Sequence, residues 1–242
     1  MNYKKQIEEM VDLAQQEKNK KYIKSQPKFI IMCGGKYSFF KKHKALSKIN
    51  GEVIVEHTIK LLKKHGIKNI VISSNNPAFD EFGVPRCTNA KNNYEAPNDK
   101  IGFKGVGYWL DAFYPCYTKC IYLYGDVWYT DNAIDIIINT YKQNKNDNIL
   151  FGSAISANKL QKNWGEPYAY LVNKPRVFQR GIAEVKKLQD EGKLLRPAIT
   201  WELYRYLNNL DVNIQQVKED TFVIIDDNEM FDIDSEQEIE NK

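Results

Sequence analysis

Short apolar runs alternate with longer amphipathic stretches along most of this chain. The apolar runs predict buried strands over residues 29–32, 69–73, 120–124, 149–153 and 168–172, and further short strands over 45–49, 212–217 and 222–225. Apolar residues at helical spacing predict helices over 53–65, 133–143, 182–188, 201–207 and 235–240, and a helix that begins within 107–113. Strands that alternate with helices favour a mostly parallel sheet covered on both faces.

The ends of the predicted elements suggest one main domain with an extension ahead of it. Ile7, Met10, Val11 and Ala14 form an apolar stripe, so residues 1–24 read as an amphipathic helix, and Pro27 closes this segment. We therefore expect an N-terminal helical extension over 1–27 and a single domain over 28–242. Residues 75–104 are rich in Asn, Pro, Gly and Lys, which predicts a long irregular region.

Composition narrows the class of protein. Apolar residues make up 43% of the 242 residues, which is enough for a full core. The net charge is +4 and the basic residues are spread widely, so we expect no nucleic-acid partner. No run reaches the roughly 18 apolar residues of a membrane span, and no apolar core follows the first residues. We expect a cytoplasmic protein without a membrane partner.

Cysteine and histidine usage argues against a zinc site. The four cysteines show no C-x-x-C spacing, and the chain has three histidines. Structural zinc sites usually draw four ligands from closely spaced Cys and His residues. We expect the cysteines to be reduced and structural.

The loop after the first strand carries the strongest chemical signal. The strand over 29–32 leads into Gly34 and Gly35, and four lysines follow: Lys36, Lys41, Lys42 and Lys44. Glycines let backbone N–H groups approach a phosphate closely, and lysines supply charge for a polyphosphate. This pattern indicates a nucleoside triphosphate site near the start of an α/β domain.

Two acidic positions could hold a cation. Asp126 follows Gly125 directly after the strand over 120–124, where open α/β sheets place ligands; it could equally serve as a turn or cap residue. Asp232 and Asp234 point to the same side of an extended segment, where two carboxylates repel unless a proton or a metal lies between them. The alternative is that one of the two simply begins the helix after Ser235, because negative charge is favoured there.

Together these features resemble the nucleotidyltransferases of the sugar-phosphate and molybdenum-cofactor type. Met32-Cys33-Gly34-Gly35 is similar to the Leu-Ala-Gly-Gly opening of that family, and His43-Lys44-Ala45-Leu46 to its Asp-Lys-Ala-Leu close. Gly125-Asp126-Val127 and the Phe-Asp-Ile-Asp-Ser-Glu segment over 231–236 complete the likeness, which covers roughly residues 28–240. The resemblance implies a Rossmann-like three-layer α/β/α fold with a mostly parallel, twisted sheet.

The resemblance also implies roles for individual residues. It makes Lys44, Asp126 and Asp234 catalytic and gives Mg²⁺ the ligands Asp126, Asp232 and Asp234. The residues implied in nucleotide binding are Cys33, Gly34, Gly35, Lys36, Lys104, Gly105, Gly107 and Gly125. For the acceptor we expect Glu166, Tyr168 and Arg196, because the segment over 164–168 precedes a strand and arginine suits phosphate.

The implied reaction joins a nucleoside triphosphate to a sugar phosphate or polyol phosphate and releases pyrophosphate. CTP is the first choice from the compact chain and the Asp-Ile-Asp-Ser ending, and the product would be an activated precursor of surface polysaccharide. A homodimer is left open. The family's loop arginine is replaced by Phe39, which cannot hold a phosphate. This departure keeps two alternatives open: a metal-dependent glycosyltransferase that uses an NDP-sugar, and a catalytically silent nucleotide-binding module.

Overall fold

The protein is described by a computed structural model over residues 28–34, 43–88, 108–154, 165–226 and 230–232. The helices predicted for 1–24 and 235–240 lie outside these residues, and so does the part of the predicted irregular region over 89–104. The expected boundary at residue 27 therefore stays a prediction.

A seven-stranded sheet forms the centre of the molecule, in the order β10-β8-β9-β6-β1-β4-β5. All neighbouring strands run parallel except β9, which is antiparallel to both β6 and β8. The strands are β1 (Lys28–Met32), β4 (Ile70–Ser73), β5 (Arg86–Cys87), β6 (Cys120–Tyr124), β8 (Asn148–Gly152), β9 (Pro167–Val172) and β10 (Phe222–Ile224).

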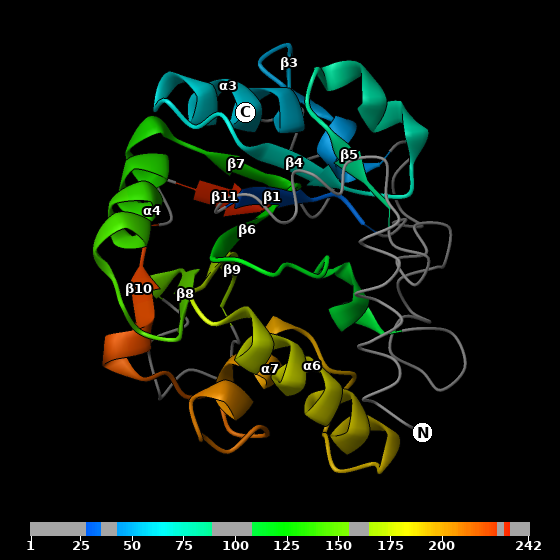
Figure 1. The fold of residues 1–242 in the computed structure, drawn as a ribbon, viewed down its shortest axis with the longest axis vertical. Helices are drawn as coiled ribbons and strands as arrows, with labels where there is room; N and C mark the ends of the chain where they lie inside the picture. The colour runs from blue at the N-terminus through cyan, green and yellow to red at the C-terminus, as the bar shows by residue number, and fades with distance from the viewer. Residues whose placement is uncertain (1–27, 35–42, 89–107, 155–164, 227–229, 233–242) are drawn as a thin grey trace.

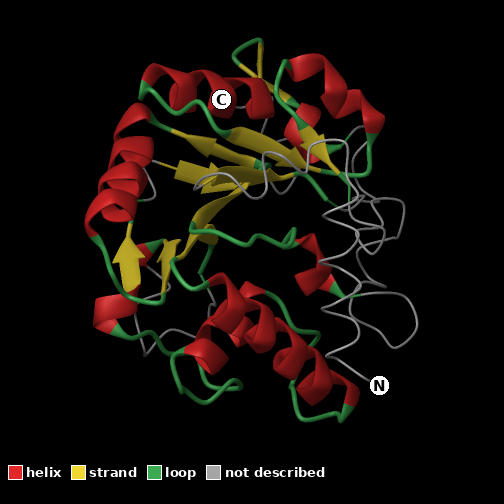
Figure 2. Ribbon diagram, viewed as in Figure 1, coloured by secondary structure: helices red, strands yellow, loops and turns green. Residues whose placement is uncertain are grey.

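Helices cover both faces of this sheet (Figures 1 and 2). One face packs against α3 (Ile54–Lys64) and α4 (Asp131–Gln143), and the other against α6 (Pro175–Asp190) and α7 (Thr200–Leu207). Alternate residues of each strand serve the two cores: Ile31 belongs to the first and Ile30 to the second, and both are at most 1% exposed. The predicted three-layer α/β/α fold with a mostly parallel sheet is confirmed.

Local chemistry sets the ends of the helices. The Thr130 side chain accepts a hydrogen bond from the Ala133 N–H, so α4 begins at Asp131, two residues before its predicted start. Gly66 follows α3 with φ +78°, as predicted for a residue that ends a helix. Helix α6 is much longer than its predicted span, because Pro175 with its fixed φ starts it.

The strand predicted over 45–49 is wrong for its first half. Residues Lys44–Leu46 form the 3₁₀ turn η1, and only β2 (Lys48–Ile49) is extended. Strand β2 pairs in a hairpin with β3 (Glu52–Val53). The hairpin turn contains Asn50 and Gly51, both at positive φ, which is the conformation that an Asn-Gly pair favours between strands.

The strand predicted over 212–217 does not form. The Asp211 carboxylate accepts from the Asn213 N–H, and the Asn213 amide donates to the Lys193 carbonyl. These side-chain bonds turn the backbone locally and offer an alternative to a strand ladder.

The region expected to be irregular and the helix expected within 107–113 both contain short 3₁₀ turns. Between residues 75 and 88 the chain forms the 3₁₀ helix η2 (Pro77–Phe82), capped by Asn76, and then the edge strand β5. The helix expected within 107–113 is the short 3₁₀ turn η4 (Trp109–Ala112). A further 3₁₀ turn, η5 (Glu219–Thr221), precedes β10.

A small antiparallel pair lies beside the main sheet and was not predicted. Strands β7 (Val127–Tyr129) and β11 (Met230–Asp232) pair with Asp232 opposite Val127. The pairing brings the end of the chain to the segment that directly follows Asp126. Along the described residues, no helix combines the length and apolar character needed to cross a membrane.

Candidate functional site

The candidate site lies where the central strands β1 and β6 end. The two strands are parallel neighbours, so Cys33 and Gly34 leave β1 at the same edge at which Gly125 and Asp126 leave β6. The Gly125 N–H donates to the Met32 carbonyl at 2.9 Å, and the Cys33 N–H donates to the Ser73 carbonyl at 2.9 Å. These bonds extend the sheet past its strand ends and fix the backbone from which Asp126 projects.

Gly125 is required by the close approach of these two segments. A Cβ atom at this position would lie 2.4 Å from Cys33 Sγ and 2.6 Å from the Met32 carbonyl oxygen. The carbonyl belongs to the backbone of β1 and cannot move without disturbing the sheet. Thus the glycine before Asp126 lets β6 approach the start of the lysine loop.

We predict that Gly125→Ala destabilises the protein by about 1–3 kcal/mol, the usual cost of overpacking. The matched control is Gly181→Ala in α6, where the added Cβ would meet only side-chain atoms: Leu207 Cδ2 at 2.6 Å, Leu207 Cγ at 3.1 Å and Leu203 Cδ1 at 3.3 Å. Because alanine also suits a helix interior better than glycine, the control should change stability by less than about 1 kcal/mol. Urea unfolding of both variants checks this, and equal stability of the two would contradict the role given to Gly125.

Lys44 and Asp126 come together at this edge. Lys44 Nζ lies 3.8 Å from Asp126 Oδ2, and the two side chains are 6% and 14% exposed. Lysine is rarely buried to this extent unless it is paired. Two residues that are 82 positions apart in the sequence, and that were predicted as catalytic from separate motifs, are therefore neighbours.

The 3₁₀ turn η1 holds Lys44 in this position. The His43 imidazole caps the turn by accepting from the Ala45 N–H, and its ring lies edge-on to Phe79 at 5.0 Å. Ala45 is fully buried, so the turn is anchored in the core beneath α3. The turn that carries Lys44 is thus fixed by its cap and by its contacts with the core.

The Asp126 carboxylate acts on a second neighbour. Burial, and after it the charge of Asp126, raises the pKa of the Cys33 thiol. Cys33 is fully buried in the core and stays a thiol at neutral pH. The site therefore holds a carboxylate beside an ammonium and an uncharged sulfur.

The backbone places Asp232 near the same point. In the pair β7–β11, Asp232 lies opposite Val127, the residue after Asp126. The sequence predicted that these two segments would meet, although 106 residues separate the aspartates. Asp234 lies outside the described residues.

The donor set at this point suits a magnesium ion. Mg²⁺ prefers carboxylate oxygens together with phosphate oxygens and water, and one or two carboxylates usually suffice. Asp126 supplies one carboxylate, and the register of β11 brings the backbone of Asp232 alongside. Among the side chains that the structure describes, no group of three or more His, Cys, Asp or Glu gathers.

The other predicted site residues are of three kinds: buried, exposed near Asp126, or outside the described part of the chain. Cys33 and Tyr168 have buried side chains, and the Cys33 N–H is already bonded to Ser73; neither enters the proposal below. Glu166 is exposed at the start of β9, at the same edge as Asp126 because β9 is antiparallel to β6. The predicted residues outside the described part of the chain are Gly35, Lys36, Lys104, Gly105 and Gly107, and so is Phe39.

An aromatic pair at the end of β6 was missed by sequence reasoning. The rings of Tyr124 and Trp109 lie 6.0 Å apart, and the Tyr124 hydroxyl contacts the Thr200 hydroxyl at the start of α7. The turn η4 that carries Trp109 is tied to α6 by the buried Lys186–Asp111 ion pair and by the Tyr108 hydroxyl, which donates to Asp190. The signal available in the sequence is the place of Tyr124 two residues before Asp126.

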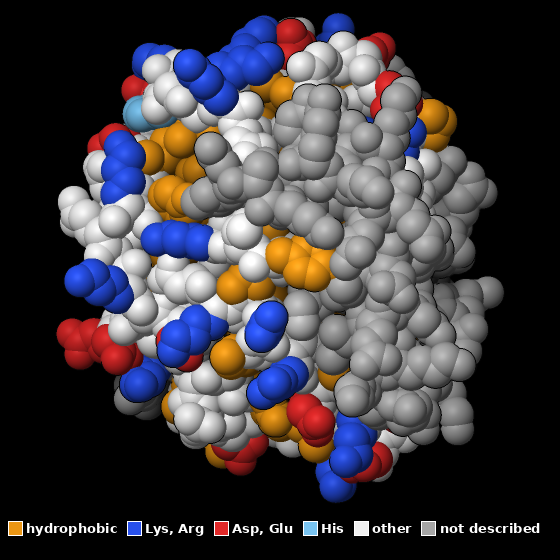
Figure 3. Space-filling view, in the orientation of Figure 1, with side chains coloured by type: hydrophobic (Ala, Val, Ile, Leu, Met, Phe, Trp, Pro, Cys, Tyr) orange, Lys and Arg blue, Asp and Glu red, His pale blue; other side chains and the backbone are white. Residues whose placement is uncertain are grey.

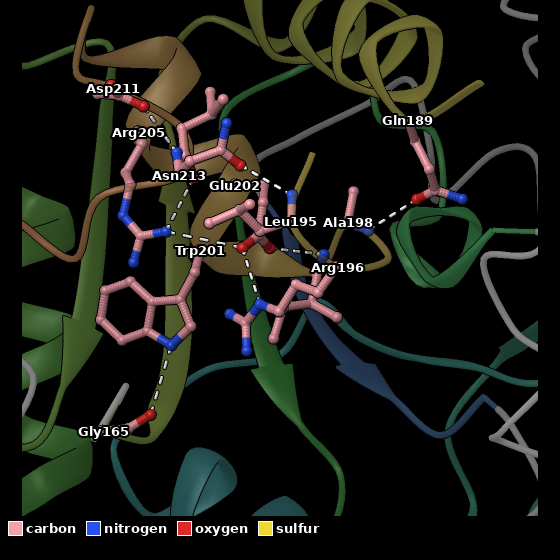
Figure 4. A network of polar contacts seen from close by, with 12 residues as sticks. Gly165, Gln189, Leu195, Arg196, Ala198, Trp201, Glu202, Arg205, Asp211 and Asn213 are labelled. Carbon is pink, nitrogen blue, oxygen red and sulfur yellow. Dashed lines mark hydrogen bonds and ion pairs between the residues drawn. The ribbon is translucent and has the colours of Figure 1, made fainter. Parts of the chain in front are cut away.

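Arg196 belongs to a polar network around Glu202 (Figure 4). The Arg196 Nε–H donates to Glu202 Oε1 at 2.9 Å, and Arg205 Nη1 lies 3.6 Å from the same oxygen. Glu202 is 2% exposed and Arg205 is fully buried. The side chain of Arg196 is 31% exposed, so this arginine is both fixed and accessible.

Figure 3 shows Lys and Arg side chains spread over the described part of one face, with Asp and Glu side chains mostly near its rim. These exposed charges act locally, since they are screened within about 8 Å at physiological salt. Lys44 differs from them because it is buried.

Comparisons with known proteins agree with this geometry. The MobA-like NTP transferase domain matches residues 29–198 of the chain. No curated protein matches the sequence.

Two solved structures resemble the whole chain. One is named as a glucose-1-phosphate thymidylyltransferase from Bacillus anthracis, with a TM-score of 0.53 and 13% identity over 90% of this chain and 93% of that one. The other is the inositol-1-phosphate CTP transferase from T. maritima, with a TM-score of 0.50 and 13% identity over 88% of this chain and 91% of that one. At this identity the likeness shows a shared fold.

Proposed function

The chain belongs to the MobA-like NTP transferase domain family, and from that premise we propose that it is a magnesium-dependent nucleotidyltransferase acting on a phosphorylated small molecule. The observation that carries this proposal is the pair Lys44–Asp126, held at 3.8 Å where the lysine loop and strand β6 end. The register of Asp232 opposite Val127 supports it independently.

The proposed reaction is one displacement at phosphorus. An oxygen of the acceptor phosphate attacks the α-phosphorus of the triphosphate and forms a new P–O bond. The bond between the α-phosphorus and its bridging oxygen breaks, and pyrophosphate leaves with the electron pair. No general base is needed, because the acceptor phosphate is already an anion.

The main barrier is the repulsion between two polyanions, and the residues at the site address it. Lys44 lies on a fixed turn, so its ammonium can offset phosphate charge without reorganisation. Asp126, Asp232 and Asp234 would hold the magnesium ion, which when bound neutralises phosphate charge and orients the triphosphate. Gly34 at the end of β1 would place a backbone N–H beside the phosphates. Fixing both reactants in line supplies much of the remaining gain.

We further propose CTP as the nucleotide and a sugar phosphate or polyol phosphate as the acceptor, in the synthesis of surface polysaccharide. The support for CTP is the resemblance of the Asp-Ile-Asp-Ser segment over 232–235. The architecture does not choose the base, since the two solved structures of this fold are named for thymidylyl and CTP transfer. A phosphorylated acceptor is compatible with Arg196, whose side chain is 31% exposed.

The test is a screen for pyrophosphate release. The full chain is incubated with each of four nucleoside triphosphates against a panel of sugar, polyol and amino-alcohol phosphates, with magnesium and with excess EDTA. We expect release that needs one triphosphate, one acceptor and magnesium, and a product whose mass equals that of the acceptor plus the nucleotidyl group.

The same panel includes NDP-sugars with sugar acceptors. Sugar transfer without pyrophosphate release would favour a glycosyltransferase. Binding of a nucleotide with no product in any arm would favour a silent binding module. Either result would contradict the proposed function.

A further inference from the structure

The first three residues of α7 each contact a different segment at the edge of the candidate site. The Thr200 hydroxyl contacts the Tyr124 hydroxyl at the end of β6. The Trp201 indole N–H donates to the Gly165 carbonyl at 3.4 Å, beside Glu166. The Glu202 carboxylate accepts from Arg196 Nε–H at 2.9 Å (Figure 4). One helical turn therefore joins the strand of Asp126 to the two segments that carry Glu166 and Arg196.

Glu202 is the centre of this arrangement. One of its oxygens accepts from Arg196 and lies 3.6 Å from Arg205, and the other accepts from the Ile199 N–H, which closes the start of α7. Burying a carboxylate is costly unless its geometry and hydrogen bonds are good, and Glu202 is 2% exposed. The guanidinium groups of Arg196 and Arg205 share this one carboxylate.

Arg205 is the buried arginine that contacts Glu202. Its side chain is fully buried, its Nη1–H donates to the Val212 carbonyl at 3.1 Å, and its guanidinium lies over the Trp201 ring. Burial lowers the pKa of Arg205 to about 10, although the Glu202 carboxylate opposes this change. Arg205 is still protonated at neutral pH, so its guanidinium keeps its positive charge.

Arg196 is the exposed member of the cluster. Its segment is held at two further points: the Gln189 side chain accepts from the Ala198 N–H at 2.7 Å, and the Asn213 side chain accepts from the Leu195 N–H at 2.9 Å. A guanidinium presents five N–H bonds in one plane. In Arg196 the Nε–H holds the Glu202 carboxylate and Nη2 is buried, so Nη1 is the group through which this side chain would meet an anion. A fixed backbone and a fixed Nε direct Arg196 with little loss of side-chain entropy on binding.

The position of α7 favours the acceptor and not the triphosphate. Lys44 and Ala45 end the glycine–lysine loop on the face covered by α3. The contacts of Tyr124 with Trp109 and Thr200 lie on the face covered by α6 and α7. Phosphoryl-type displacements place the attacking and leaving oxygens roughly in line on opposite sides of the phosphorus. A triphosphate held on the α3 side therefore leaves the α7 side for the attacking acceptor.

We propose that Thr200, Trp201 and Glu202 form one wall of the acceptor site and position the acceptor. Glu202 directs Arg196 toward the anionic group of the acceptor. Thr200 fixes this wall to Tyr124, two residues before Asp126. This inference rests on the proposed function and adds positioning residues to it. Trp201 links the same wall to the segment of Glu166.

The test separates acceptor binding from nucleotide binding. Glu202→Gln keeps the size and the acceptor for the Ile199 N–H but removes the charge that holds Arg196. We expect KM for the acceptor to rise about tenfold to a hundredfold, in line with the loss of a charged hydrogen bond. KM for the triphosphate should stay within about twofold, because this residue does not act on ground-state binding of the nucleotide.

Three further single variants and one double variant keep the test decisive if Glu202→Gln does not fold. Arg196→Lys alters a partly exposed side chain, keeps the charge and loses the planar fork, and it should give the same split in KM. Thr200→Val removes the hydroxyl that contacts Tyr124. Thr200→Val and Tyr124→Phe should lower kcat equally, and the double variant should be no worse than either single one, because both break one contact.

The control is Asp147→Asn, which breaks the 2.7 Å ion pair with Lys174 ahead of β8, at the opposite end of the sheet. It should leave both KM values unchanged, and thermal unfolding should report any general loss of stability in every variant. If the wild type releases pyrophosphate but Arg196→Lys leaves the acceptor KM unchanged or raises both KM values equally, the inference is overturned. If the wild type itself releases none with any acceptor, the proposed function fails instead.

Discussion

Asparagine in place of Asp126 is expected to lower kcat by about a hundredfold to a thousandfold, the usual effect of removing one electrostatic contact from a transition state. The substitution keeps the size of the side chain and removes the charge that pairs with Lys44 and would hold magnesium. Pyrophosphate release at saturating substrates measures kcat. The fold should survive, because Gly125 and the backbone bonds to β1 are untouched.

Asp147→Asn is the matched control for this prediction as well. It removes one carboxylate from an ion pair at the far end of the sheet, so kcat should stay within about twofold of the wild type. Near-normal turnover of Asp126→Asn, with a circular dichroism spectrum like that of the wild type, would remove Asp126 from the reaction.

Methionine in place of Lys44 is expected to lower kcat/KM for the triphosphate by about a hundredfold, in the range of a charged hydrogen bond to phosphate. Methionine is unbranched and fills much of the space of the buried stem, while the charge is lost. Lys44 is 5% exposed on a fixed turn, so no nearby side chain on that turn can replace it. The initial rate at varied triphosphate concentration gives the value.

Lys48→Met is the control for Lys44→Met. Lys48 lies four residues further along, in β2, and is exposed, so its charge is solvated and should contribute little. An effect of similar size in the two variants would mean that general positive charge, and not the position of Lys44, supports the reaction.

The strands of the sheet were predictable because burial on both faces leaves a continuous apolar run. The span predicted for β6 is the observed one, β8 is shifted by one residue at both ends, and β9 begins one residue earlier than predicted. Strands β7 and β11 are three residues long and exist only through each other, across about 100 residues of chain. A local sequence pattern cannot predict a strand whose partner is so distant, because tertiary pairing decides whether the strand forms.

The false strand over 212–217 has the opposite cause. Three apolar residues, Val212, Ile214 and Val217, lie at nearly alternate positions, which is the pattern of a half-buried strand. Asp211 and Asn213 override it with side-chain bonds to the backbone. These short polar residues were the available warning, because they compete with regular hydrogen bonding.

The candidate site was predictable where it follows the ends of strands. The sequence predicts that Gly34, Gly125 and Asp126 lie together because parallel strands bring their carboxyl ends to one edge, and the parallel pairing of β1 with β6 agrees with this. Thr200, Trp201 and Glu202 were missed, since a glutamate in an amphipathic helix looks like an exposed residue. Its burial between two arginines depends on how α7 packs, and the sequence of α7 does not reveal this.

The proposed activity depends most on one cation, which Asp126 and Asp234 would hold beside the lysine loop. Manganese binding, followed by electron paramagnetic resonance with CTP present, tests this directly on the wild type, Asp126→Asn and Asp234→Asn. We predict one tightly bound ion per wild-type chain and at least about tenfold weaker binding in each variant. Equal manganese affinity in all three proteins would contradict it.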